Sequence, residues 1–86
     1  MSGYKVSVGS ATRRVRTFQE AGAFVVEHVT GLLAQDPEGA AEGVMRANRE
    51  FSGGFVQQAV EADGIWRMSL TVHDEPVRVE VRKRWW

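Results

Sequence analysis

Apolar and polar residues alternate near both ends of the chain, and this period of two predicts β-strands. At the N-terminal end, residues 4–8 read "YKVSV", with the apolar residues at the even positions. A Gly-Ser pair at 9–10 interrupts the pattern, and Ala11, Arg13 and Val15 then continue the inward face. Residues 4–16 are therefore expected to form a β-hairpin.

Two further alternating segments, "IWRMSLTV" at 65–72 and "VRVEVRKRWW" at 77–86, flank a turn at 73–76. We expect them to pair with Val72 opposite Val77, which places Trp66, Met68 and Leu70 on one face together with the valines of the last segment. The same register predicts that Arg67 lies opposite Arg82, a like-charged pair that repels.

The period changes to 3.6 in the middle of the chain, which predicts a helical hairpin over residues 17–52. Thr17 and Glu20 have the spacing of a capping box, and Asp36-Pro37-Glu38 has the pattern of a second helix start. The first apolar stripe consists of Phe18, Ala21, Phe24, Val25, Val29, Leu32 and Leu33. The second consists of Ala40, Ala41, Val44, Met45, Asn48 and Phe51.

Residues 55–61 fit a helical face as well as a strand. The strand interpretation requires a three-residue loop at Ala62-Asp63-Gly64 with Gly64 left-handed, so that Val56, Gln58 and Val60 share a face with Trp66. On that basis we predict an α+β fold of about five antiparallel strands packed on a two-helix hairpin, in the order ββααβββ. The alternative order is ββαααββ, with residues 55–61 helical.

Length and composition indicate a single small domain spanning residues 1–86. The chain has no cysteine, which rules out disulfides, thiolate zinc sites and thiol nucleophiles. It begins without an apolar leader and has no apolar run as long as a membrane span, so a cytoplasmic protein without a membrane partner is expected.

The sequence contains no clear catalytic, metal-binding or phosphate-binding motif. We therefore expect no catalytic residue, no cofactor, no metal and no enzymatic activity. His73-Asp74-Glu75 places three metal-ligand types in one turn, but three consecutive residues rarely converge on one ion. His28 and Asn48 are interpreted as buried polar groups with hydrogen-bond partners inside the fold.

The charged residues are distributed unevenly along the sequence. The net charge is zero, but residues 1–18 carry four cations and no acid, whereas residues 19–45 carry five acids and no cation. The expected registers turn seven cations and one acid, Glu80, away from the helices. An open basic sheet face is a plausible surface for an anionic partner. The alternative is a solvated face that is basic because of arginine-rich codon usage.

We therefore expect a small non-enzymatic protein-interaction or accessory module that associates with itself or with another protein. The expected surface is the basic sheet face with the tryptophan ending, where Trp85 covers the end of the core and Trp86 either frays or acts as an anchor for another protein. The alternative is a nucleic-acid-binding accessory protein that uses the same arginines. The candidate partner-binding residues are Arg14, Arg16, Arg67, Arg78, Arg82, Arg84 and Trp86.

Overall fold

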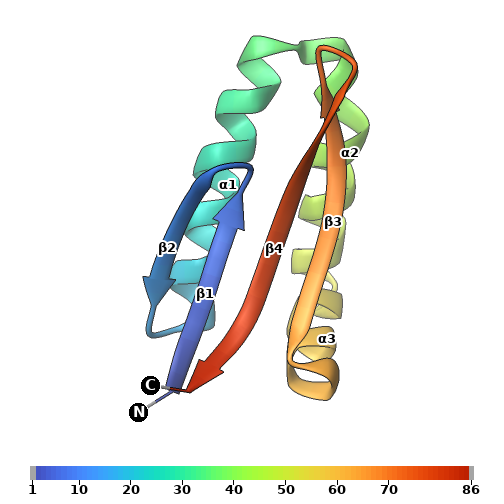
Figure 1. The fold of residues 1–86 in the computed structure, drawn as a ribbon. Helices are drawn as coiled ribbons and strands as arrows, with labels where there is room; N and C mark the ends of the chain where they lie inside the picture. Colours follow the sequence, from blue (N-terminus) through green and yellow to red (C-terminus); the bar gives the residue numbers. More distant parts are fainter. Residues whose placement is uncertain (1, 86) are drawn as a thin grey trace.

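The computed structural model describes residues 2–85 as an α+β fold of four strands and three helices (Figure 1). This confirms the fold class and the antiparallel sheet, but the expected five strands and two helices are wrong. The elements are β1 (Ser2–Val8), β2 (Ala11–Val15), α1 (Phe18–Gln35), α2 (Pro37–Ser52), α3 (Phe55–Asp63), β3 (Ile65–Val72) and β4 (Glu75–Trp85).

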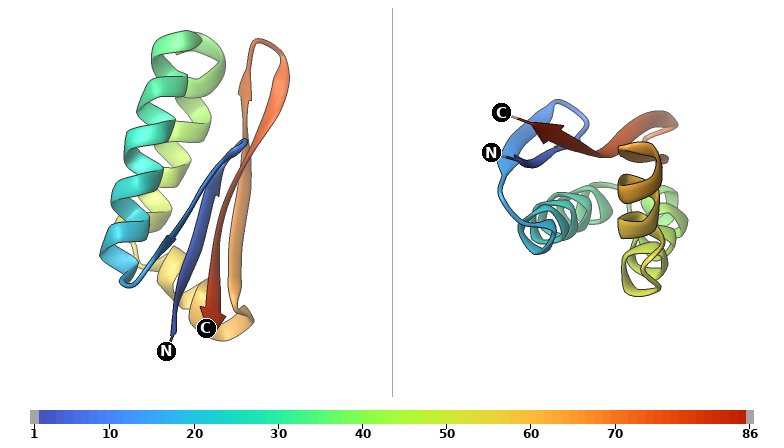
Figure 2. Two further views of the ribbon diagram at one scale, coloured as in Figure 1. Left: turned by 60° about the vertical axis from the view of Figure 1, so that its left-hand side comes forward. Right: turned by 90° about the horizontal axis from the view of Figure 1, so that it is seen from below.

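The strands form one antiparallel sheet in the order β2-β1-β4-β3, with the helices packed against one face (Figure 2). The first and last strands therefore lie side by side at the centre of the sheet. In consequence β4 is an internal strand, and the two edges of the sheet are β2 and β3. The opposite face is not covered by any helix of the described chain.

The two helix starts form as the sequence predicts. The Thr17 hydroxyl accepts a hydrogen bond from the Glu20 N–H over 3.1 Å, which caps α1. The Asp36 carboxylate accepts from the Gly39 N–H over 3.2 Å at the start of α2, with Pro37 in the first turn. These local contacts fix where the helical hairpin begins and where it reverses.

Residues 55–63 form helix α3, so the strand predicted for residues 55–61 is wrong and the alternative order ββαααββ is observed. Gly64 is left-handed as expected, with φ 77°, but it terminates α3 instead of closing a hairpin loop. The helix buries Val56 and Val60 one turn apart and leaves Gln57 and Gln58 exposed. A strand would have turned Gln58 toward the core together with the two valines.

The β3–β4 hairpin has a shorter turn than expected. His73 and Asp74, with φ 52° and 65°, form a two-residue turn in which both central residues are left-handed. Val72 therefore pairs with Glu75 instead of Val77. The shift is two residues, so each side chain keeps its predicted face, but the cross-strand partners change.

The core lies between the sheet and the helices and is rich in valine. Trp66, Met68 and Leu70 point into it, as predicted. The stripe predicted for α2 is partly wrong, because Met45 and Asn48 are exposed and Ala47 is buried in their place. Small residues face the core here because α2 lies very close to β3: a Cβ on Gly43 would clash with Leu70.

Candidate functional site

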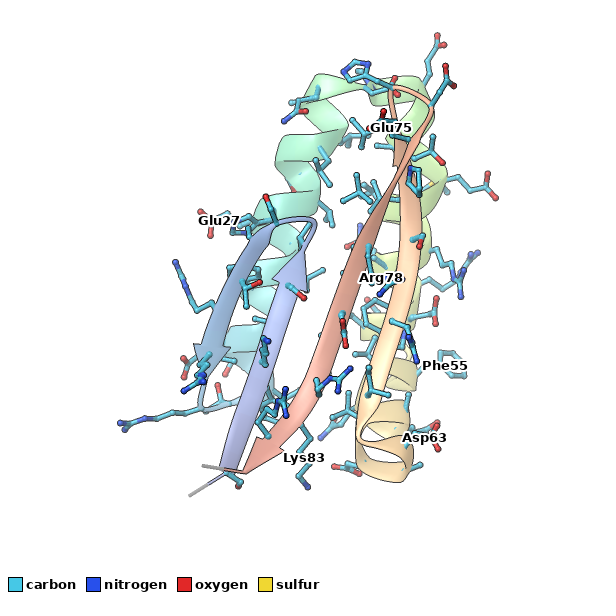
Figure 3. All side chains as sticks on the ribbon, in the orientation of Figure 1. Glu27, Phe55, Asp63, Glu75, Arg78 and Lys83 are labelled. Atoms are coloured by element: carbon cyan, nitrogen blue, oxygen red, sulfur yellow. The ribbon has the colours of Figure 1, made fainter. Side chains whose placement is uncertain are left out.

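The candidate site is the open face of the sheet, on the side away from the helices. Six of the seven predicted residues belong to the described chain, while Trp86 lies outside the described residues. Arg14, Arg67, Arg78 and Arg84 are exposed, and Arg82 is half-buried. Arg16 follows the end of β2 and is also exposed. Figure 3 shows this face, with Arg78 labelled on β4.

A row of three cations crosses this face. Lys5 on β1 lies directly opposite Arg14 on β2 and, on its other side, directly opposite Arg82 on β4. Like charges that face each other across strands destabilise a sheet. The pairing of the central strands β1 and β4, which the sequence does not reveal, is what brings this row together.

Glu80 lies on the same face of the sheet, in the row next to Lys5 and Arg82. Its carboxylate accepts two hydrogen bonds from the Arg82 guanidinium, at 3.1 Å from Nε and 2.8 Å from the terminal nitrogen. The Glu80 side chain is only 18% exposed. Across the strands it lies opposite Arg67 and Ser7.

The predicted repulsion between Arg67 and Arg82 is therefore wrong. The shorter turn moves Arg67 opposite Glu80 and leaves Ile65 opposite Arg82. Arg67 thus faces an acid, and the like-charged contacts of this face lie around Lys5 instead.

A shallow depression of about 320 Å³ opens between β1 and β4 on this face. Its lining includes the small residues Ser7, Gly9 and Thr12 together with longer charged side chains. The complete lining consists of Lys5, Ser7, Gly9, Thr12, Arg78, Glu80, Arg82 and Arg84. The structure therefore gathers Arg78, Arg82 and Arg84 around one hollow, whereas Arg14, Arg16 and Arg67 lie outside its lining. We define the basic face as Lys5, Ser7, Thr12, Arg14, Arg67, Arg78, Glu80, Arg82 and Arg84.

The two polar residues that the sequence predicts to be buried, His28 and Asn48, lie on helices and not on this face. His28 is half-buried on α1, with Nδ1 2.9 Å from the Phe24 carbonyl oxygen and its ring stacked on Phe24. Asn48 was expected to be buried and is instead exposed on α2. Within residues 2–85, no three His, Asp or Glu side chains are grouped in a way that could hold a metal ion.

The described helices also include none that is long and apolar enough to span a membrane. No protein-family model, curated protein or solved structure matches the chain. We therefore infer a function from the geometry of the chain itself.

Proposed function

We propose that this protein is a non-enzymatic interaction module whose basic face binds an acidic surface of a partner protein. The observation that carries the proposal is the row of Arg14, Lys5 and Arg82 on an uncovered sheet face. Lys5 has a cation on each side in this row, so a carboxylate of a partner that lies over it is attracted by more than one positive charge.

Arginine suits this role because its planar guanidinium can donate two parallel hydrogen bonds to one carboxylate. The hydroxyls of Ser7 and Thr12, which lie opposite each other on the same face, add donors between the cations. Together these groups can bind several carboxylates over a flat surface.

Nucleic acid is the second candidate, because phosphates also bind arginine clusters. One observation favours a protein over it: the described residues of the basic face include no aromatic ring on which a base could stack, since Tyr4 and Trp66 face the helices.

The test compares the affinity of the protein for a labelled oligoglutamate peptide and for DNA and RNA oligomers of matched charge, by fluorescence anisotropy. We expect salt-sensitive binding of the peptide and no tighter binding of the oligomers. In Lys5→Glu, which reverses the central charge of the row, the affinity for the peptide should fall about tenfold.

The matched control is Lys83→Glu. Lys83 is exposed near the end of β4, on the helix side of the strand and opposite Tyr4 (Figure 3). The Lys83→Glu variant should leave the affinity for the peptide nearly unchanged. Oligomers that bind more than about tenfold tighter than the peptide would replace the proposal with the nucleic-acid function. No binding of either probe at low salt would refute both.

A further inference from the structure

Ser7 lies in the middle of the depression on the basic face. It lies opposite Thr12 on β2 and opposite Glu80 on β4. Lys5 and Gly9 are two positions away from it along the chain, one on each side. All four of these neighbours also line the depression. Because serine, glycine and threonine are short, the depression results from short residues that lie among long charged ones.

The depression has an excess of positive charge. Its lining includes four cations and one acid, Glu80. Glu80 is paired with Arg82 over 2.8 Å, so these two charges largely cancel. Lys5, Arg78 and Arg84 form no ion pair with another residue of the described chain. Three positive charges therefore remain for a ligand.

Two of these cations, Lys5 and Arg78, lie on opposite sides of Ser7. The Gly9 N–H donates to the Arg78 carbonyl over 2.8 Å, so Arg78 on β4 lies level with Gly9 (Figure 3). Lys5 lies in the other direction along the chain, and its backbone is about 13 Å from that of Gly9 at the rise of a strand. A group that lies over Ser7 is therefore between the two cations.

Hydroxyl groups supply further donors at the same place. Ser7 and Thr12 lie directly opposite each other. Ser7 is half-buried and Thr12 is exposed, and neither hydroxyl forms a hydrogen bond with another described residue. Cations on two sides and hydroxyls between them suit an anion whose oxygens point in several directions.

A phosphoryl group fits this arrangement better than a carboxylate does. A carboxylate carries one negative charge and two oxygens in one plane, so a single guanidinium can satisfy it. A phosphoryl group on serine or threonine carries a charge of about −1.5 to −2 at pH 7 and has three acceptor oxygens. These oxygens can accept hydrogen bonds from Lys5, from Arg78 and from the hydroxyls of Ser7 and Thr12.

The surroundings of the depression favour a phosphorylated segment of a protein over a free phosphate ion. The basic face continues beyond the depression on both sides, because Arg14 lies opposite Lys5 and Arg67 lies opposite Glu80. Acidic residues next to a phosphorylated residue can contact these outer arginines, whereas a free phosphate ion in the depression cannot. The short side chains of phosphoserine and phosphothreonine also match a shallow site.

We propose that the depression binds the phosphoryl group of a phosphorylated serine or threonine in an acidic segment of the partner protein. This inference rests on the proposed function, because it assigns one group of the acidic partner to one part of the basic face. The rest of the basic face then binds the acidic residues on either side of that group.

The experiment compares three labelled acidic peptides that differ at one central position, which holds phosphoserine, glutamate or serine. Fluorescence anisotropy gives their affinities, and circular dichroism verifies that each variant is folded. The phosphoserine peptide should bind about tenfold tighter than the glutamate peptide. In Arg78→Ala this preference should fall to about twofold or less.

Arg67→Ala is the matched control, because it removes an exposed arginine of the same face that does not line the depression. It should weaken the binding of all three peptides by similar factors and leave the preference for phosphoserine intact. Unlabelled O-phosphoserine should compete much more weakly than the unlabelled phosphoserine peptide.

Equal affinities for the phosphoserine and glutamate peptides would overturn the inference and leave the binding of acidic peptides by the basic face in place. An equal loss of preference in Arg67→Ala and Arg78→Ala would also overturn it, because the preference would then come from the charge of the whole face. Competition by O-phosphoserine as strong as that by the peptide would replace the protein segment with a small phosphomonoester. Only the absence of binding to every acidic peptide, including oligoglutamate, would refute the proposed function as well.

Discussion

The Asp36 carboxylate accepts a hydrogen bond from the His73 N–H over 2.8 Å, although 37 residues separate the two. The same carboxylate caps α2 through the Gly39 N–H. One side chain therefore ends the turn between the two long helices and holds the left-handed turn between β3 and β4. This contact joins the helical layer to the sheet at one end of the molecule.

Asp36→Ala should destabilise the fold measurably, because it leaves the N–H groups of Gly39 and His73 without this acceptor. Asp36→Asn keeps an acceptor oxygen and should lose less. Thermal unfolding followed by circular dichroism gives the comparison. Glu38→Ala, which removes an exposed carboxylate from the same helical turn, is the control. If both alanine variants melt alike, the contact with His73 contributes nothing.

The acid stability of the protein should depend on Asp36. The hydrogen bond from the His73 N–H, followed by that from the Gly39 N–H, lowers the pKa of this carboxyl below its ordinary value of 3.8. A group whose pKa is lower in the folded state contributes stability that is fully present above its unfolded pKa. That contribution is lost as the pH falls through the folded pKa.

In a pH series of urea unfolding, the free energy of unfolding of the wild type should therefore fall more steeply than that of Asp36→Asn below about pH 4. Above about pH 5 the difference between the two proteins should be constant. Parallel curves at all pH values would contradict the role assigned to this carboxylate.

Gly43→Ala should destabilise the protein, although alanine is the better helix former. The added Cβ would clash with Leu70 and push α2 away from β3, at a cost of about 1–3 kcal/mol. Gly31 on α1 is the matched control, because a Cβ there meets nothing within 4 Å. Gly31→Ala should stabilise the protein by about 0.5–1 kcal/mol. Urea unfolding gives the free energy of unfolding of both variants. Equal changes in this free energy would show that the close approach of α2 to β3 is not essential.

Lys5→Glu should stabilise the isolated protein while weakening the binding of an acidic peptide. The new carboxylate would lie between Arg14 and Arg82 and convert two like-charged neighbours into opposite charges. Cross-strand pairs of this kind contribute about 0.2–1 kcal/mol each. Thermal unfolding measures the first effect and fluorescence anisotropy the second. A variant that is less stable than the wild type would show that the two cations beside Lys5 do not destabilise the sheet.

Much of the local structure follows from the sequence. Thr17, Glu20 and Asp36 place the helix starts correctly because a cap depends only on residues within one turn of it. The inward faces of β1, β2, β3 and β4 also follow, since a period of two assigns each side chain to a face whatever its partner strand.

Residues 55–63 show where the local pattern is insufficient. Nine residues with Val56 and Val60 on one side fit either period, and a left-handed glycine such as Gly64 ends a helix as readily as it closes a loop. Burial resolves the ambiguity, because only the helix buries both valines while leaving Gln58 in solvent.

The sequence by itself determined which face of the sheet each strand residue belongs to. Only the tertiary structure decided how the outer residues meet. Pairing of β1 with β4 placed Lys5 beside Arg82, and the two-residue turn at His73 and Asp74 moved Arg67 from Arg82 to Glu80. The reason is physical: the face of a side chain depends on its own strand, whereas its neighbours depend on strand order and register, which long-range packing fixes.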